Sequence, residues 1–377
     1  MSRTLLVTND FPPRRGGIQS FVYGMARRFD GDELVVYSST SGGAEEFDRA
    51  QDFHVIRDKT TMLLPTRRVG RAAVDIAREY NCDRVWFGAA APLGLLARRL
   101  RAEAGIKRAV GLTHGHEAGW AALPIARGRL QAIANEVDVL TYLGGYTQRR
   151  LQRALGERTS LQKLTFGVDT EAFSPEVDGH TVRQRWGLEG RSVIVCVSRL
   201  VPRKGQDVLI EILPEIKKTV PNAALFIVGE GPYEKKLRRL AHKHGVTGDV
   251  VFAGLAPENE LAAHYRAGDV FAMPCRTRLG GIDFEGLGAV FVEAAGCGLP
   301  TVVGDSGGAP SAVVDGHTGH VVDGTNPRQV ATQLTQILAD KELAAKYGVA
   351  GREWVLNEWT WDKQAERLKN MLSLEEG

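Results

Sequence analysis

D-F-E-G-L-G-A-V-F-V-E-A-A-G-C-G-L-P, at residues 283–300, holds two glutamates, Glu285 and Glu293, separated by a glycine turn and a short apolar run. The apolar run predicts a helix, so Glu285 precedes that helix and Glu293 lies about two turns inside it. A helix N-terminus presents unpaired N–H groups and a partial positive charge. Both carboxylates are therefore expected beside a position that suits an anionic ligand.

The two glutamates differ in how much they demand of their surroundings. Acidic residues are common before helices, so Glu285 alone is compatible with a purely structural role. Glu293 has apolar or small neighbours throughout 289–297, and an unpaired buried carboxylate costs several kcal/mol. We expect a ligand to be its hydrogen-bonding partner, with a structural backbone or arginine contact as the alternative.

Length and composition indicate a globular protein of two domains. The chain has 377 residues, which exceeds what one hydrophobic core usually sustains. It is 43% hydrophobic and 25% charged, close to the globular average, which argues against disorder. No two of the four cysteines are spaced as C-x-x-C, so neither disulfides nor a zinc site are expected and a reducing cytosol is indicated.

No targeting or membrane-spanning segment is expected. The N-terminus has too short an apolar run for a signal peptide and is typical of a first strand. Residues 286–304 are long and apolar enough to suggest a membrane span. Their glycines and Pro300 instead divide them into a helix and a strand.

The positive charge is concentrated in the first half of the chain. Residues 1–168 carry 25 Lys and Arg against 17 Asp and Glu, net +8, whereas the remainder is net −5. Solvated helix faces are one explanation of the individual arginine pairs. The bias of the whole half favours an anionic partner surface. Membrane lipid fits better than nucleic acid, because no helix-turn-helix, zinc-finger or RNP-type motif is present.

Short β-branched runs alternate with helical patterns, which is typical of an α/β fold built from parallel sheets covered on both faces. The strand-like segments are 4–8, 34–38, 84–88, 109–113 and 137–143, then 192–198, 223–228, 249–253, 270–273 and 299–303. Helices are expected between them, at 18–29, 92–103, 207–220 and 233–244, and after them, at 328–338, at 342–356 and in a last helix to about 372. A turn-rich stretch at 166–179 separates the two sets. We expect Trp359 and Trp361 to anchor the end of the chain by burial.

Ligands of parallel sheets bind beyond the carboxyl ends of the strands, so the loops there are the candidate sites. After the first strand, Gly16 and Gly17 allow backbone N–H groups to approach a phosphate, although a plain turn explains them equally well. The spacing G-x-G-x-x-G is missing here and at Gly229, which argues against a dinucleotide-dependent oxidoreductase.

A second basic loop follows the strand at 192–198. Arg199, Arg203 and Lys204 precede a helix, an arrangement that suits a diphosphate, although exposed basic loops are also common. Because this loop belongs to the same predicted sheet as Glu285 and Glu293, we expect one site in which cations bind phosphates and carboxylates bind sugar hydroxyls.

Neither candidate metal motif is convincing. H-G-H-E, which begins at His114, has no third ligand at a familiar spacing, so His114 is better suited to hydrogen bonding or positioning. Asp30-Gly31-Asp32 resembles a divalent-metal D-x-D, but it lies at the amino edge of the sheet, where we expect a solvent-exposed turn. We therefore predict a metal-independent protein.

Taken together, these stretches resemble the retaining family-four glycosyltransferases. The motifs are G-V-D-x-x-x-F at 167–173, S-R-L-x-x-x-K-G at 198–205, V-G-x-G-P at 228–232 and E-G-L-G-A-V-F-V-E-A at 285–294. The resemblance implies the GT-B fold, in which two Rossmann-like parallel-sheet domains face each other across a cleft. It implies an acceptor- and membrane-facing domain of residues 1–168 with 357–377, including a returning last helix, and a nucleotide-sugar domain of residues 169–356.

The resemblance also implies a role for each motif residue. Arg199 and Lys204 would neutralise the donor diphosphate, and Glu293 would bind the ribose. Glu285 would hold the transferred sugar, with His114 near the C6 side of that sugar, so neither glutamate would be a nucleophile or a general acid. The remaining donor-binding positions implied are Gly16, Gly17, Gly229, Leu255, Ala256, Gly286, Leu287 and Gly288, and the acceptor positions are Gln19 and His116.

Within that family, N-D-F-P-P-R-R-G-G-I-Q-S, T-H-G-H-E and F-A-M-P-C-R-T-R resemble the actinobacterial enzymes that add the second mannose in phosphatidylinositol mannoside synthesis. This implies GDP-mannose as donor, a glycolipid acceptor, and a cytoplasmic enzyme peripheral on the inner face of the cell membrane. The chain departs from the family at Ser311, where Glu is frequent, and in a longer loop at 275–284. A related transferase with another nucleotide sugar or acceptor is the alternative.

Overall fold

The computed structural model describes residues 3–115, 117–120, 123–157 and 159–374. By its contacts the chain divides into two compact units. The first, here called the N-unit, comprises Met1–Gly167 and Trp361–Gly377, and the second, the C-unit, comprises Val168–Thr360.

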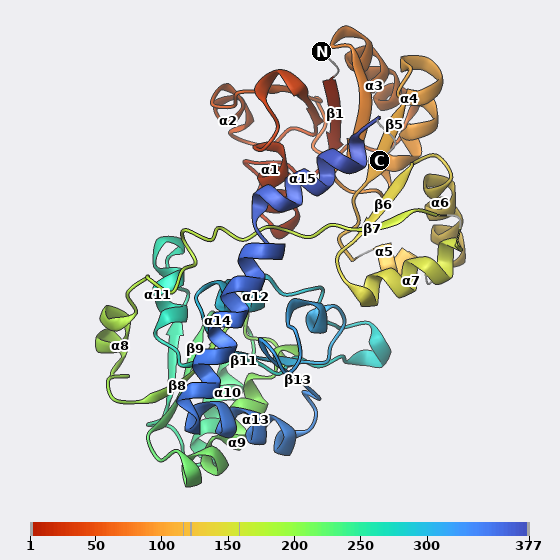
Figure 1. Ribbon diagram of the computed structural model, residues 1–377. Helices are drawn as coiled ribbons and strands as arrows, with labels where there is room; N and C mark the ends of the chain where they lie inside the picture. Colours follow the sequence, from red (N-terminus) through yellow and green to blue (C-terminus); the bar gives the residue numbers. More distant parts are fainter. Residues whose placement is uncertain (1–2, 116, 121–122, 158, 375–377) are drawn as a thin grey trace. The chain divides into compact units, whose positions relative to one another are not determined.

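The N-unit is built on a seven-stranded parallel sheet in the order β3-β2-β1-β4-β5-β6-β7 (Figure 1). Its strands are β1 (Arg3–Thr8), β2 (Leu34–Ser38), β3 (His54–Arg57), β4 (Cys82–Phe87), β5 (Arg108–Gly111), β6 (Val139–Tyr142) and β7 (Leu161–Lys163). The central strands are buried on both faces and consist mostly of aliphatic and aromatic residues, which explains why they dominate the sequence pattern.

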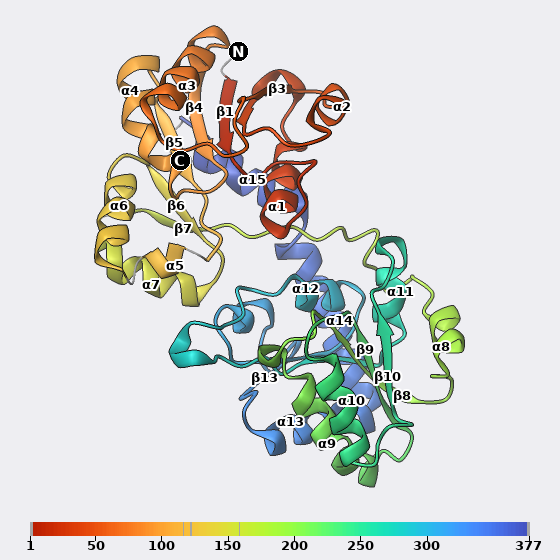
Figure 2. The same ribbon diagram turned by 180° about the vertical axis from the view of Figure 1, so that it is seen from behind.

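Helices cover both faces of this sheet. They are α1 (Gly17–Ala26), α2 (Ala44–Arg49), α3 (Arg67–Glu79), α4 (Ala97–Ala104), α5 (Glu117–Trp120), α6 (Pro124–Ala134), α7 (Gly145–Leu155) and α15 (Trp361–Leu372). Helix α15 packs on α1, β4 and β5, whereas α3 and α4 pack together on the opposite face (Figures 1 and 2). One hydrophobic core cluster fills the space between the sheet and α3 and α4, around Val85, Phe87 and Leu96.

The C-unit repeats this design with six parallel strands in the order β10-β9-β8-β11-β12-β13 (Figure 2). Its strands are β8 (Ser192–Val197), β9 (Ala223–Val228), β10 (Val250–Gly254), β11 (Val270–Met273), β12 (Thr301–Gly304) and β13 (Gly319–Val322). Its helices are α8 (His180–Trp186), α9 (Gln206–Thr219), α10 (Glu234–Lys243), α11 (Leu261–Arg266), α12 (Ala289–Gly296), α13 (Pro327–Ala339) and α14 (Lys341–Glu358).

The strand order locates the candidate sites. In each sheet the first strand of the unit, β1 or β8, has the next strand of the sequence, β2 or β9, on one side. On its other side lies a later strand, β4 or β11, so the order of the strands reverses at this point. Loops leaving the carboxyl ends of such neighbours diverge and open a crevice at the strand ends. The expected α/β architecture with two parallel sheets is confirmed, and the loops after β1, β4, β8 and β11 become the places to examine.

The chain passes between the units at two adjacent points. Val168 and Thr360 form a parallel bridge in the C-unit, and the Val168 amide donates to the Trp359 carbonyl (2.7 Å). In the N-unit, Gly167 lies so close to Trp361 that a β-carbon would collide with it. Trp359 is 1% exposed, which confirms its expected burial, whereas Trp361 is only half-buried.

The differences from the predicted elements lie mainly at the sheet edges. Three of the four edge strands, β3, β7 and β13, were not predicted. Residues 286–304 divide into α12 and β12 as expected, and Asp30-Gly31-Asp32 forms a turn with both aspartates exposed. Among the described residues, no helix combines the length and the apolar character needed to cross a membrane.

Candidate functional site

The C-unit brings Lys204 and Glu285 together at the point where its strand order reverses. Lys204 ends the loop after β8, and Glu285 lies in the long segment between β11 and α12. The Lys204 Nζ is 2.7 Å from the Glu285 Oε2, and the two side chains are only 10% and 8% exposed. A cation and a carboxylate 81 positions apart in the sequence therefore form one buried pair at the predicted crevice.

Close backbone packing holds the two loops together. Gly205, the N-cap of α9, has φ 82°, and a β-carbon at this position would collide with the Pro274 carbonyl oxygen. Only glycine accepts both the left-handed conformation and this contact. The Arg276 amide also donates to the Arg203 carbonyl (2.8 Å), so the loops after β8 and β11 are joined on both sides of the pair.

Three buried polar atoms beside this pair have no hydrogen-bond partner among the described residues, namely the Arg203 Nε, the Asp207 Oδ1 and the Gln206 Oε1. A fourth, the Glu285 Oε2, is in ion-pair contact with Lys204 but accepts no hydrogen bond of good geometry. A buried polar group left unpaired costs about 1–3 kcal/mol, so such groups are rarely gathered in one place without a purpose. Three acceptors and one donor match a ligand that carries both hydroxyls and anionic oxygens.

A second ion pair braces the same loops. The Arg276 guanidinium lies 2.6 Å from the Asp207 carboxylate at the start of α9, and the Tyr233 hydroxyl donates to the same carboxylate oxygen (3.0 Å). Asp207 thereby links the segments that follow β8, β9 and β11. Sequence reasoning missed this role, because an acidic residue in the first turn of a helix is already explained by the helix dipole.

The other predicted C-unit positions surround the pair in different ways. The Arg199 side chain is exposed and forms no ion pair or hydrogen bond within the described chain. Gly229 has a structural reason to be glycine, since a β-carbon would collide with the Ser198 carbonyl oxygen. Leu255 is 69% exposed, and Ala256 next to it is half-buried in the loop after β10.

The segment 286–288 leads from Glu285 into α12. A β-carbon at Gly286 would meet no atom within 4 Å, so space is open beside this residue, whereas Leu287 is 3% exposed. Gly288 caps α12 at φ 85° without a side-chain cap, so N–H groups of the first turn remain available to an acceptor group of a ligand.

Glu293 is bonded within the protein, by a residue that the sequence did not suggest. The Tyr265 hydroxyl, fully buried on α11, donates to the Glu293 Oε2 (2.7 Å), and the Oε1 has no partner among the described residues. The expected alternatives were a ligand and a backbone or arginine contact. Burial raises the pKa of the Glu293 carboxyl, and the tyrosine hydrogen bond opposes that rise. Burial likewise raises the pKa of Tyr265, so the phenol remains a donor.

In the N-unit, the loop after β1 carries Gly16 and Gly17 at the start of α1. Both are exposed, and Gly16 leaves room for the Gln19 side chain, whose Nε2 donates to the Asp10 Oδ1 (2.7 Å). Gln19 is therefore held against the same loop that contains the two glycines.

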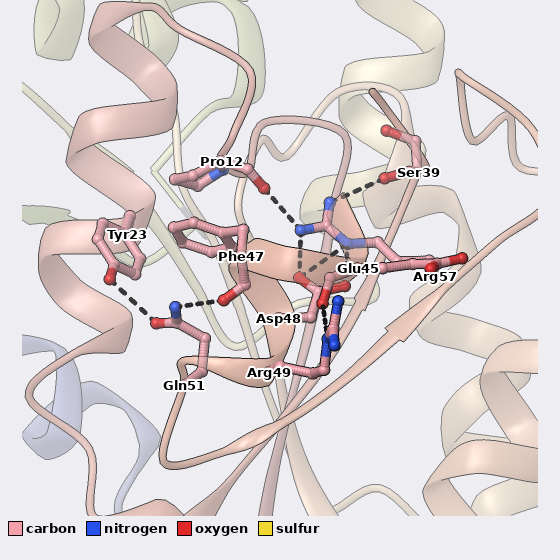
Figure 3. Close-up of polar contacts among 9 residues, drawn as sticks. All are labelled: Pro12, Tyr23, Ser39, Glu45, Phe47, Asp48, Arg49, Gln51 and Arg57. Carbon is pink, nitrogen blue, oxygen red and sulfur yellow. Dashed lines mark hydrogen bonds and ion pairs between the residues drawn. The ribbon is translucent and has the colours of Figure 1, made fainter. Parts of the chain in front are cut away.

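Arg57 fixes this loop to its neighbours, as Figure 3 shows. Its guanidinium donates to the carbonyls of Pro12 (2.6 Å) and Ser39 (3.0 Å) and lies 2.7 Å from Asp48 of α2. Arg57 ends the edge strand β3, so one side chain ties together the segments that follow β1, β2 and β3. The position of the Gly16–Gly17 turn is thus set from behind.

His114 lies just beyond β5, at the carboxyl end of the N-unit sheet. Its Nε2 is 2.5 Å from the Gly88 carbonyl, at the end of β4, and its ring packs edge-on against Phe21 of α1 (5.2 Å between centroids). The His114 amide donates to the buried Glu117 carboxylate (2.9 Å). His116 lies outside the described residues. Within the described chain, no three His, Cys, Asp or Glu side chains converge as a metal site would require.

Comparison with known proteins agrees with this architecture. The family model for glycosyl transferases group 1 matches residues 180–354. Over 98% of both chains, the protein is 49% identical to a GDP-mannose-dependent alpha-(1-6)-phosphatidylinositol monomannoside mannosyltransferase of Mycolicibacterium smegmatis. It is also 44% identical to a monoacylated-acceptor counterpart of Corynebacterium glutamicum, over 99% of this chain and 98% of that protein.

Solved structures extend the likeness to the fold. The Anabaena protein Alr3699/HepE in complex with UDP matches with a TM-score of 0.79 at 19% identity, over 99% of both chains. Sucrose-phosphate synthase of Thermosynechococcus elongatus matches with a TM-score of 0.73 at 18% identity, over 98% of both chains. At this identity the likeness concerns the fold alone. The expected GT-B class, with two Rossmann-like parallel-sheet domains, is confirmed at that level.

Proposed function

Because the chain belongs to the group 1 glycosyltransferases, we propose that it transfers mannose from GDP-mannose to a phosphatidylinositol monomannoside, with retention of configuration. Relatives from two genera, matched over at least 98% of this chain, are named as GDP-mannose-dependent phosphatidylinositol monomannoside mannosyltransferases. Retention of configuration is what the family resemblance implies. The structural observation that supports the proposal is the buried Lys204–Glu285 pair at the carboxyl ends of β8 and β11. Buried polar atoms without a hydrogen-bond partner lie in the same loops.

The C-unit binds the donor in this proposal. Arg199 and Lys204 bind the diphosphate, and Glu285 with the backbone of 286–288 holds the mannose. The Oε1 of Glu293 accepts from the ribose hydroxyls, while its Oε2 is already taken by Tyr265. The exposed Leu255 and the half-buried Ala256 border the base, and Gly229 keeps the neighbouring loop close to Ser198. Among the described residues no group of three His, Cys, Asp or Glu side chains could hold a metal ion, and metal independence remains a prediction.

The chemical step is front-face attack by the acceptor hydroxyl on the anomeric carbon, without a protein nucleophile. The bond to the diphosphate breaks as the new glycosidic bond forms, and the proton of the acceptor hydroxyl passes to the departing phosphate oxygen. Negative charge accumulates on this leaving group in the transition state. Fixed cations beside that charge stabilise the transition state more than the ground state. Lys204 is positioned for this by its buried pairing, and Arg199 adds a second, unpaired cation.

The N-unit binds the acceptor. Gly16 and Gly17 reach the donor diphosphate, His114 lies near the C6 side of the mannose, and Gln19 contacts the acceptor. His114 suits a positioning role, because Gly88 and Phe21 already fix its ring. These roles rest on the family resemblance.

The enzyme acts at an anionic membrane surface, on the inner face of the cell membrane. In the described part of the N-unit, Met62, Leu64, Leu123 and Ile125 are each at least half exposed. Arginines at 67–68 follow Met62 and Leu64, and arginines at 127 and 129 follow Leu123 and Ile125. All of them lie in the half of the chain with net charge +8. Apolar side chains beside arginines favour an interface of anionic lipid, and the attraction should weaken as salt rises.

The decisive experiment combines donor selection with transfer. A thermal-shift panel of GDP, UDP and ADP with their sugar derivatives should show the largest stabilisation with GDP and GDP-mannose, because at equal concentration the ligand that binds the folded state most tightly stabilises it most. A transfer assay with phosphatidylinositol monomannoside should then yield a dimannosylated product in the presence of EDTA. Selective stabilisation by another nucleotide would replace the donor, and turnover that requires Mn²⁺ would contradict metal independence.

A further inference from the structure

The segment between β11 and α12 carries an exposed apolar turn at residues 279–282, here called the tip. Leu279 is 68% exposed and Ile282 is 80% exposed, among the highest values for apolar residues of the described chain. The surrounding cyan segment projects from the body of the C-unit in both views (Figures 1 and 2). Two aliphatic side chains are therefore presented to solvent on one short turn.

The backbone holds these side chains outward at a conformational cost. Leu279 has φ 52°, and Gly280 and Gly281 follow with φ 62° and 96°. A leucine in the left-handed region is disfavoured and persists only where the surroundings impose it. The tip is closed by the Arg278 amide donating to the Asp283 carbonyl (2.8 Å), and the two side chains lie 3.5 Å apart. The turn is thus a braced feature.

Two arginines lie at the base of the tip, and each is paired with an aspartate. The Arg278 side chain is 37% exposed, and Arg276 lies two residues before it, paired with Asp207. Aliphatic side chains in front of guanidinium groups form the pattern of interfacial segments, in which the chains enter the acyl region and the cations remain with the phosphates.

The tip is also close to the transferred sugar. Ile282 precedes Glu285 by three residues, which span at most about 11 Å even when fully extended. The lipid acceptor under the proposed function carries only an inositol and a mannose beyond its phosphate. A side chain this close to the sugar site is within reach of the surface from which the acceptor projects.

We propose that the C-unit contacts the acceptor's bilayer itself, by inserting Leu279 and Ile282 into an anionic phospholipid surface. This inference rests on the proposed function for the identity of that surface. It adds a contact in the donor-binding unit to the basic surface of the N-unit, and gives the long loop at 275–284 a purpose.

The test uses a double variant that removes the apolar surface without straining the fold, Leu279→Asn with Ile282→Ser. Asparagine is among the residues most tolerant of positive φ, so the turn should be kept or relieved. Val349→Ser is the matched control, since Val349 is a 61% exposed aliphatic residue of α14 in the same unit and the two residues have similar helix propensity.

Full-length proteins are sedimented with phosphatidylcholine–phosphatidylinositol vesicles at about 0.5 M salt, where the Debye length of about 4 Å leaves mainly the apolar contribution. The double variant should bind roughly tenfold more weakly than the wild type, and the control should bind equally. GDP binding and melting temperature should be unchanged, or the melting temperature raised. Turnover should fall on vesicle-embedded acceptor and remain unchanged on the deacylated, water-soluble acceptor.

Equal vesicle binding by the double variant and the wild type would overturn the inference. A parallel loss of turnover on the deacylated acceptor would also overturn it, because the tip would then contact the headgroup. If the wild type transfers mannose to neither acceptor, the proposed function fails, while vesicle binding still decides whether the tip meets a membrane.

Discussion

Asp58 in the N-unit and Glu285 in the C-unit are both 6% exposed carboxylates beside a cation, yet their surroundings are opposite. Asp58 receives two hydrogen bonds from Arg68 (2.7 and 3.0 Å), one from Tyr37 (2.6 Å) and two from Thr60. The hydrogen bonds from Arg68 hold the pKa of Asp58 well below its usual range.

Glu285 has the Lys204 ammonium 2.7 Å away and the Arg203 guanidinium 3.6 Å away, but its Oε2 has no hydrogen bond of good geometry. The difference teaches how to read a buried ion pair. A carboxylate whose lone pairs are all taken holds a fold together, whereas one left partly unsatisfied has capacity for a ligand.

The largest effect is expected from Lys204→Ala. Removing a fixed cation beside a leaving diphosphate should lower kcat by about 10²–10³-fold, with the fold intact, because Arg203 remains near Glu285. Single-turnover kinetics and a melting curve measure the two consequences. Lys217→Ala is the control, since Lys217 on α9 pairs with Asp249 and should leave kcat unchanged. Near-normal turnover of the Lys204 variant would refute its assignment.

Glu285→Gln should follow, with a loss of turnover near a hundredfold and little change in stability. Glutamine still presents an oxygen to the Lys204 ammonium, so the buried lysine keeps an acceptor and the free energy of unfolding should fall by only about 1 kcal/mol. Denaturant unfolding and the transfer assay, run on the same preparation, separate the two. A large loss of stability with full turnover would show that Glu285, like Asp58, has a structural role.

Asp58→Asn should show the reverse, a loss of about 2–3 kcal/mol of stability at pH 7 with turnover per folded molecule preserved. Because the folded-state pKa is depressed, the contribution of Asp58 is present above the unfolded pKa of about 3.9 and is lost as pH falls through the folded value. The difference between wild type and variant should therefore shrink below about pH 4. A difference that is constant across pH 3–7 would contradict the ionic role.

Tyr265→Phe should have the smallest effect, a roughly fivefold to tenfold weaker GDP affinity with kcat unchanged at saturating donor. Its hydrogen bond lowers the pKa of Glu293, so its loss should also move the acid-side decline of GDP binding to higher pH. Calorimetric titration with GDP and with 2′,3′-dideoxy-GDP tests the mechanism, because the affinity gap between them should narrow. Tyr347→Phe, which removes a contact with His320, serves as control. An unchanged gap would show that Tyr265 does not act through the ribose contact.

Central strands were predictable from the sequence, whereas three of the four edge strands were not. β8 and β9 are nearly continuous β-branched and aliphatic runs, because both faces of a central strand are buried. β3 reads H-V-I-R with no fully buried residue, and β7 is the three residues L-Q-K. Such segments become strands only because a partner strand already offers its backbone groups, which no local pattern records.

The site divides in the same way. Lys204 and Glu285 could be placed in one site from motifs and from the order of strands, since loops after β8 and β11 must leave the same edge of the sheet. The sequence could not predict the Asp207–Arg276 and Tyr265–Glu293 pairs. Each pair joins two segments that come close only because of how the loops or helices pack. The expectation of a ligand for Glu293 omitted the possibility that a tyrosine takes one oxygen and leaves the other.

The paired crossings at Gly167–Val168 and Thr360–Trp361 make the C-unit an uninterrupted insertion whose two ends meet in the Val168–Thr360 bridge. Units inserted at adjacent points can be excised, exchanged or expressed alone with little disturbance to the host. The C-unit is therefore expected to be exchangeable as one continuous piece of chain. Under the proposed function, grafting a homologous insertion with another nucleotide preference between Gly167 and Trp361 should change the sugar delivered while keeping the acceptor.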